Sequence, residues 1–198
     1  QEVIFGKTIT DPYRWLEDFT SKEATDWVDR QNKLTDAFLE NEYQRKIKED
    51  LKDIWITEDI SIPFRRGDRT FYYYDNGKQQ QSVFMMKDCN SCEAEVLLDP
   101  NQFSTDGTIS LSDISVSPNG EYLAYAISDG GSDWRTWKVF NIKEKRDTDD
   151  VIEWSKFSYA TWESDSSGFY YQKYQQPDEA LSDIKKSPQL FFHRPVSY

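Results

Sequence analysis

"IPFRRGDRTFYYY", residues 62–74, is the first of three stretches of this chain that share one design. The second is "ISVSPNGEYLAYA" (114–126) and the third is "ATWESDSSGFYYQ" (160–172). Each begins with a short apolar segment, passes through a polar turn that ends in glycine, and closes with a segment of alternating large residues. Alternation is typical of β-strands, because successive side chains of a strand point to opposite faces. The design therefore predicts a strand, a turn and a strand, three times over.

The repeat has a regular period. Its turn glycines are Gly67, Gly120 and Gly168, which lie 53 residues (120 − 67) and then 48 residues (168 − 120) apart. Periods near fifty residues with four strands in each unit are typical of β-propeller blades. We therefore predict a series of blades, with an ordinary β-sandwich that repeats by coincidence as the alternative.

Residues 57–198 contain about ten short segments that are rich in aromatic and β-branched residues and are separated by turn residues. Because no crossover helix is indicated between them, we expect antiparallel sheets. Blades are expected at about 60–100 and 110–153, with a third from about 157. The predicted fold is mainly β with N-terminal helices: a partial β-propeller of about two and a half antiparallel four-stranded blades. Because propellers close with roughly four to eight blades, we expect this to be the front of a longer protein.

Two helices are expected before the strands. Residues 20–40 carry apolar side chains at helical spacing, and Thr20 with Glu23 fits a capping box, in which each side chain satisfies a free backbone N–H group of the other residue. A second amphipathic helix is expected at about 43–55. A helix pair this short buries too little apolar surface to be stable alone.

The stretch "DPYRWLED", residues 11–18, combines acidic residues with large apolar ones. Pro12 fixes its own φ and disfavours a helical conformation in the residue before it, so we expect an extended segment. Tyr13, Trp15 and Leu16 would not be needed in a solvated loop. They are expected to anchor the segment on a larger body, or alternatively to pack on the propeller itself.

Composition and charge exclude several functions. The formal net charge of -12 argues against a nucleic-acid partner, since phosphate binding needs a basic surface. No apolar run approaches the length of a membrane span, so no membrane partner is expected. No charged-then-apolar leader is present, which leaves the compartment open between cytoplasm and periplasm. No Gly-rich phosphate loop appears, and no cofactor is expected.

The chain has two cysteines, Cys89 and Cys92, in "DCNSCEAE". A zinc site needs four ligands, and the sequence has neither a second C-x-x-C pair nor a histidine pair, so no metal site is expected. A redox role would need a helix that opens just after the first cysteine, and none is indicated. A polar loop in which the two cysteines are free or locally oxidised is the preferred interpretation.

Several stretches resemble the prolyl oligopeptidase family of serine peptidases. They are "DPYRWLED", "WVDRQNKLTDAFLE", "LLDPNQFSTDGTISL", "SPNGEYLAYAISDGGSDW" and "DVIEWSKFSYATWESDSSGFYY". The resemblance covers nearly the whole chain, and the "LLDPN" and "GSDW" stretches point to the proline-specific branch. It implies a seven-bladed propeller over an α/β-hydrolase catalytic domain, access limited to short peptides, and cleavage after proline. Related peptidases with dibasic specificity share the opening motif.

The resemblance also implies a division of the chain. Residues 1–56 would pack on the α/β-hydrolase domain, which these 198 residues do not contain, and 57–198 would be the incomplete propeller. The function implied is the N-terminal portion of a proline-specific serine oligopeptidase, with short proline-containing peptides as substrates of the complete enzyme. The alternative is a stand-alone, non-catalytic propeller-like module for binding or oligomerisation.

No catalytic residue is predicted in this chain. An α/β-hydrolase needs a G-x-S-x-G turn, an acid and a histidine in that order, and the turn is absent. The single histidine, His193, has no nucleophile nearby in the sequence and is expected to be structural. The acidic pair Asp149 and Asp150 is expected on a solvated face or in a cap. Without nucleophile, base and oxyanion hole, the chain alone is predicted to be inactive.

One substrate contact is implied by the resemblance. Phe157, in "WSKFSYATW", matches the phenylalanine of the family's propeller that lines the pocket for the substrate's proline ring. A flat aromatic wall suits a pyrrolidine ring, which has no N–H group to lose. The alternative is that Phe157 belongs to the core between blades. Asp133, in "GSDW", matches a recurrent propeller position that could face the central tunnel, and no substrate contact is assigned to it.

Overall fold

A computed structural model of the chain describes residues 2–176 and 187–196. The chain divides into two compact units, Gln1–Trp55 and Ile56–Tyr198. Among the described residues, no helix has the length and apolar content needed to cross a membrane, and no cluster of three or more potential metal ligands occurs.

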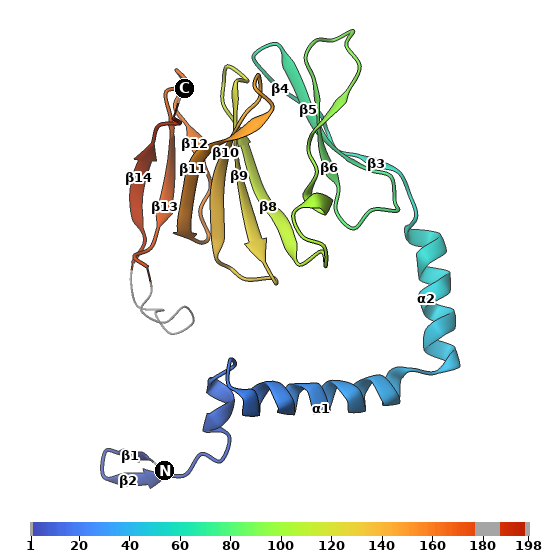
Figure 1. Cartoon of the computed structure of the whole chain (residues 1–198), viewed down its shortest axis with the longest axis vertical. Helices are drawn as coiled ribbons and strands as arrows, with labels where there is room; N and C mark the ends of the chain where they lie inside the picture. The colour runs from blue at the N-terminus through green and yellow to red at the C-terminus, as the bar shows by residue number, and fades with distance from the viewer. Residues whose placement is uncertain (1, 177–186, 197–198) are drawn as a thin grey trace. The chain divides into compact units, whose positions relative to one another are not determined.

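The first unit begins with a short hairpin, continues through one 3₁₀ turn and ends in two helices (Figure 1). Its elements are β1 (Glu2–Ile4), β2 (Lys7–Ile9), η1 (Arg14–Glu17), α1 (Lys22–Leu39) and α2 (Glu42–Trp55). Both predicted helices are present, within two residues of the expected bounds.

The stretch at 11–18 is not extended throughout. Arg14–Glu17 forms the 3₁₀ turn η1, in which Leu16 N donates to Tyr13 O at 2.9 Å. The Trp15 side chain folds back on the same turn, because its Nε1 donates to Pro12 O at 3.0 Å. The prediction of an extended segment is therefore wrong here: hydrogen bonds within the stretch offset the preference that the proline imposes.

The N-cap of helix α1 lies one residue later than predicted. Ser21 is the N-cap, and its Oγ accepts a hydrogen bond from Ala24 N at 3.2 Å. Thr20 instead donates its hydroxyl to Asp18 Oδ1 at 2.8 Å. The predicted capping box of Thr20 with Glu23 is therefore wrong, because Asp18 binds the threonine before the helix begins.

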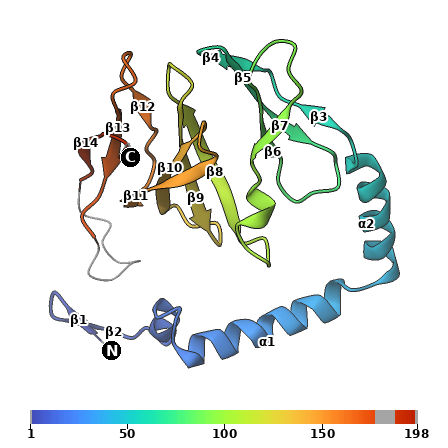
Figure 2. The ribbon, with the colours of Figure 1, turned by 45° about the horizontal axis from the view of Figure 1, so that its top comes forward.

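The described residues of the second unit form three antiparallel sheets, which Figures 1 and 2 show one after another along the chain. The first sheet contains β3 (Asp59–Ile60), β4 (Phe64–Arg66), β5 (Arg69–Asp75), β6 (Val83–Lys87) and β7 (Glu95–Leu98), and the short 3₁₀ turn η2 (Pro100–Gln102) follows it. The second contains β8 (Ile109–Val116), β9 (Tyr122–Asp129), β10 (Arg135–Asn141) and β11 (Arg146–Ser155). The third contains β12 (Thr161–Trp162), β13 (Phe169–Lys173) and β14 (Gln189–His193).

This arrangement confirms the predicted series of antiparallel blades. Blades one and two are complete, and the described residues of blade three supply three strands, with β14 as the third. In blade two the strands pair in the order β8, β9, β10 and β11, whereas in blade one β3 and β4 both pair with β5, which is followed by β6 and β7. All of these pairings are antiparallel, as expected for sheets without crossover helices. We refer to the three sheets as blades one, two and three.

Two apolar cores lie between neighbouring blades, and strand β9 contributes to both. Leu123 and Tyr125 pack in the core that blade two shares with blade one. Ala124 and Ala126 pack in the core that it shares with blade three. The alternation follows from the two-residue period of a strand, and it explains why all four of these side chains are buried.

Two of the three turn glycines of the repeat, Gly67 and Gly120, lie where blade one meets blade two. Gly67 N donates to Pro118 O at 2.9 Å, which joins the turn of blade one to that of blade two. A Cβ atom on Gly120 would lie 2.6 Å from Arg66 O, and a Cβ on Gly67 would collide with Asn119 O. Both glycines also have positive φ, 55° for Gly67 and 73° for Gly120. These two turns therefore need glycine both for their conformation and for the close approach of the neighbouring blade.

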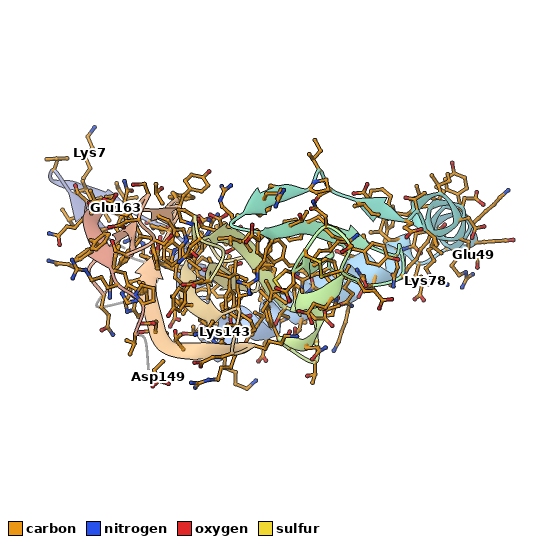
Figure 3. The ribbon with its side chains drawn as sticks, turned by 90° about the horizontal axis from the view of Figure 1, so that it is seen from above. Lys7, Glu49, Lys78, Lys143, Asp149 and Glu163 are labelled. Atoms are coloured by element: carbon orange, nitrogen blue, oxygen red, sulfur yellow. A yellow bond between two sulfur atoms is a disulfide. The ribbon has the colours of Figure 1, made fainter. Side chains whose placement is uncertain are left out.

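The loop between β6 and β7 carries a disulfide between Cys89 and Cys92. Of the two alternatives that the sequence left open, local oxidation is the one that the structure has. Seen from above in Figure 3, many side chains lie between the ribbons of the blades, and the labelled Asp149 lies at the edge of the ribbon.

Candidate functional site

Phe157 lies in the connection between β11 and β12, which leads from blade two to blade three. Its side chain is 65% exposed and belongs to neither apolar core. The alternative of an inter-blade core residue therefore does not describe it. Its φ of 53° places it in the left-handed region, which bulky residues rarely adopt. The backbone thus holds a large apolar ring in solvent at the end of a strand.

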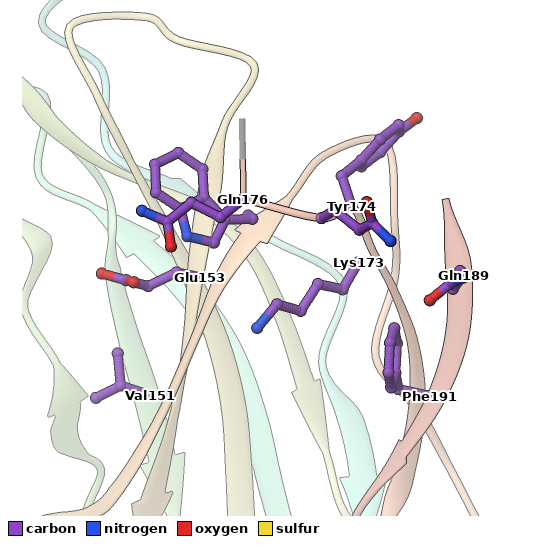
Figure 4. A pocket seen from close by; sticks show the side chains of 9 residues that line it. Val151, Glu153, Lys173, Tyr174, Gln176, Gln189 and Phe191 are labelled. Atoms are coloured by element: carbon purple, nitrogen blue, oxygen red, sulfur yellow. The ribbon is translucent and has the colours of Figure 1, made fainter. Parts of the chain in front are cut away.

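One pocket lies between blades two and three, and its lining includes Trp154, three residues before Phe157. Its volume is about 480 Å³, and Figure 4 shows its walls. Strand β11 supplies Val151 and Glu153, whereas Lys173 and Phe191 come from β13 and β14. Lys173 extends across the pocket toward β11 (Figure 4). The lining thus combines apolar, acidic and basic side chains.

A second pocket, of about 320 Å³, lies within blade two and shares Glu153 and Trp154 with the first. Its lining includes the cation Arg135 as well as the acids Asp129 and Glu153. The Nη1 atom of Arg135 lies 3.9 Å from Asp113 Oδ2. Burial raises the pKa of Asp113, and Arg135 only partly counteracts this shift. Asp113 Oδ2 is buried without a hydrogen-bond partner among the described residues. The other oxygen of this carboxylate, Oδ1, accepts a hydrogen bond from Ile114 N at 2.8 Å.

Asp133 lies in the loop between β9 and β10 and is exposed. The next residue, Trp134, lines the 320 Å³ pocket together with Trp154. The structure therefore places the "GSDW" stretch near the end of β11, close to the connection that carries Phe157. The sequence singled out Asp133 and Phe157 but gave no reason to select Arg135 or Asp113.

His193 has a structural partner. Its Nε2 lies 2.9 Å from Asp150 Oδ1, and Asp150 Oδ2 accepts hydrogen bonds from Thr148 Oγ1 at 2.7 Å and Val196 N at 3.0 Å. Asp150 is only 5% exposed, so the prediction of a solvated face is wrong for it. A buried carboxylate needs such partners. The contact between Asp150 and His193 joins β11 of blade two to β14 of blade three. The Thr148 hydroxyl binds Asp150 and not the His193 ring, so it is not placed as a nucleophile beside a histidine base.

Comparison with known proteins places this arrangement in one family. The family model described as the prolyl oligopeptidase N-terminal β-propeller domain matches residues 1–194. The prolyl endopeptidase of Elizabethkingia miricola is 38% identical over 196 residues, which are 98% of this chain and 28% of that protein. Prolyl oligopeptidase A of Amanita bisporigera is 34% identical over 188 residues, which are 84% of this chain and 25% of that protein.

Solved structures agree with the sequence comparisons. A chain from a study of two prolyl endopeptidases has a TM-score of 0.86 at 29% identity, over 98% of this chain and 29% of its own length. Prolyl oligopeptidase B of Galerina marginata, bound to a 35mer hydrolysis and macrocyclization substrate, has a TM-score of 0.79 at 26% identity, over 94% of this chain and 29% of its own. The chain thus spans under a third of the length of these relatives, and it belongs to the prolyl oligopeptidase family, whose N-terminal β-propeller region it matches.

Proposed function

We propose that these residues supply the first blades of a propeller that limits the access of short peptides to the catalytic domain of a proline-specific serine peptidase. The relatives that the chain matches along 98% of its length are named prolyl endopeptidases and are more than three times as long. One solved relative holds a peptide substrate. The sequence itself carries no G-x-S-x-G turn, so the nucleophile of this proposal comes from outside these 198 residues.

The first unit, in this proposal, docks on the catalytic domain. Its helices present large apolar side chains to solvent: Phe38 is 83% exposed and Trp55 is 78% exposed. A groove of about 400 Å³, lined by Leu16, Phe19 and Trp27 among others, lies between η1 and α1. Helices of this length depend on packing for their stability, so these faces need a partner. In this proposal the partner is the catalytic domain, and the relatives are long enough to contain one because the matched region is only 28% of their length.

Phe157 forms one wall of the pocket for the substrate's proline ring. The observation that carries this assignment is its exposure in a left-handed connection outside both cores. An exposed apolar ring in a sparsely populated conformation adds nothing to the core and is a candidate ligand contact. A pyrrolidine ring can pack flat on it without leaving a polar group unpaired.

The test is Phe157→Ala in the full-length protein that contains these residues. Losing one apolar wall is expected to lower kcat/KM for a peptidyl-prolyl chromogenic substrate about 10- to 100-fold, as for modest losses of apolar contact. Much of the change should appear in KM, because the reacting groups are not altered. The melting temperature should hardly change, because the side chain is exposed.

Tyr159→Ala is the matched control, since Tyr159 is a second exposed ring, 73% exposed, in the same connection. We expect it to change kcat/KM less than about 2-fold, as for a surface substitution without a named contact. An unchanged kcat/KM in the Phe157 variant would refute the assignment to the proline pocket.

A further inference from the structure

The five residues 154–158 form a segment that is tied down on both sides of Phe157. Trp154 O accepts a hydrogen bond from Tyr174 N at 2.8 Å, which joins the end of blade two to the residue after β13. Trp154 and Phe157 both have positive φ, 64° and 53°. Two left-handed residues that are not glycine, three positions apart, persist only where the surroundings over-determine them.

Two buried serines anchor the segment to a single residue of blade three. Ser155 Oγ donates to Gln172 O at 2.8 Å, and Gln172 N donates to Ser158 Oγ at 2.7 Å. Ser155 Oγ also accepts from Trp137 Nε1 at 3.2 Å. Both hydroxyls are buried and hydrogen-bonded, so the ends of the tight connection Ser155–Ser158 are fixed on the backbone of β13.

Lys156 fixes the middle of the segment through an aromatic cluster, which consists of Trp134, Trp154 and Tyr174. The ring of Trp134 meets Trp154 edge-on at 5.7 Å and Tyr174 edge-on at 5.6 Å. The Lys156 Nζ atom lies 4.3 Å from the Trp134 ring centroid and 5.1 Å from that of Tyr174. Both distances fall within the range of cation–π attraction.

The side chain of Lys156 therefore turns to the aromatic cluster, and that of Phe157, the next residue, stays in solvent. We propose that Lys156 is a positioning residue: its ammonium, held by Trp134 and Tyr174, fixes the turn that presents the Phe157 ring to the peptide substrate. This inference rests on the proposed function of Phe157. The two serines set where the turn begins and ends, and the ammonium selects the conformation between them.

The test is a double-mutant cycle in the full-length protein that contains these residues. Lys156→Met keeps the length of the side chain and removes the charge. We expect it to lower kcat/KM for a peptidyl-prolyl chromogenic substrate about 2- to 5-fold, which is the population shift that one partly exposed cation–π contact supports. The loss should appear in KM, with kcat nearly constant. In a Phe157→Ala background the same change should have less than about a 1.5-fold effect, because no ring is left to position.

Two further variants isolate the cause. Lys156→Arg retains a cation that packs on aromatic rings, and we expect it to restore kcat/KM. Lys138→Met is the matched control: this lysine is on β10 of blade two, 3.9 Å from Asp147, and it should leave kcat/KM unchanged.

The outcomes separate the two proposals. If Phe157→Ala alone leaves kcat/KM unchanged, the proposed function of Phe157 is wrong. If Phe157→Ala lowers kcat/KM but Lys156→Met has no effect, or lowers it equally in both backgrounds, the positioning role is overturned and the proline-pocket role stands. A failure of Lys156→Arg to restore the activity would also overturn the role of the cation.

Discussion

The turn glycines at the blade contact lead to the most specific stability prediction. Gly120→Ala should lower the free energy of unfolding for two reasons, which a second glycine-to-alanine variant can separate. The first is conformational, because φ is 73° at Gly120 and a left-handed alanine costs about 1–2 kcal/mol. The second is steric, because the new Cβ would lie 2.6 Å from Arg66 O, which is a backbone atom. The two turns would have to separate, and overpacking of this kind typically costs about 1–3 kcal/mol more.

Gly130→Ala is the control because Gly130 carries only the first cost. Its φ is also positive, at 57°, but a Cβ there would meet no atom within 4 Å. At about 2–4 °C of melting temperature per kcal/mol for a chain of this size, we expect Gly120→Ala to melt roughly 2–12 °C below Gly130→Ala. Thermal unfolding of the 198-residue chain, followed by tryptophan fluorescence, measures the difference.

A third variant tests whether the two turns act as one contact. Gly67→Ala strains the same contact from the side of blade one, where its Cβ would collide with Asn119 O. Because a separation caused by one alanine makes room for the other, the double variant Gly67→Ala/Gly120→Ala should lose less stability than the sum of the two single losses. Equal melting temperatures for Gly120→Ala and Gly130→Ala, or strict additivity in the double variant, would refute the close blade contact.

Two further predictions concern the two cores between the blades, one for each core. Trp137→Ala should destabilise the chain by about 3–5 kcal/mol, since the Trp137 side chain is fully buried in the core between blades two and three. Trp55→Ala is the control and should have little effect, because Trp55 is 78% exposed. Urea unfolding of the same chain measures both changes. Burial, with a smaller contribution from Asp113, raises the pKa of Tyr73 from 10.0 to about 12. The folded state therefore holds this proton more tightly than the unfolded state, so stability should fall as the pH rises from 10 toward 12, and Tyr73→Phe should reduce that fall.

The sequence predicts the blades well because their signals are local. Strand β5 has the bounds Arg69–Asp75, the same as the aromatic segment "RTFYYYD". Gly67 and Gly120 indicate the turns, because each has a positive φ and lies too close to the backbone of the neighbouring blade to carry a side chain. Strand β9 packs on two cores, so its sequence is an unbroken run in which large residues (Leu123, Tyr125) alternate with small ones (Ala124, Ala126).

The N-terminal errors come from competition between nearby polar groups. Thr20 and Ser21 are both good N-cap residues, and Asp18 decides between them by binding the threonine hydroxyl. The hairpin of β1 and β2 was not predicted at all. Its turn at Phe5 and Gly6 has positive φ at both residues, and the glycine flanked by alternating apolar residues is a signal that could have indicated it.

The site was only partly predictable because its geometry is tertiary. The family resemblance selected Phe157, but the sequence does not predict its exposure or its left-handed backbone. Phenylalanine is usually buried and seldom adopts positive φ. The anchoring of Ser155 and Ser158 depends on Gln172, in a different blade. The pairing of His193 with Asp150 likewise joins residues 43 positions apart in the sequence.

The most direct test of the proposed function compares the purified 198-residue chain with the full-length protein that contains it, on one peptidyl-prolyl chromogenic substrate. We expect the full-length protein to release the chromophore, a serine-directed inhibitor to abolish the release, and an alanyl analogue of the substrate to be cleaved far more slowly. The chain alone should give no turnover, because it has no G-x-S-x-G turn. Inhibitor-sensitive turnover by the chain alone, or a full-length protein that does not cleave after proline, would contradict the account.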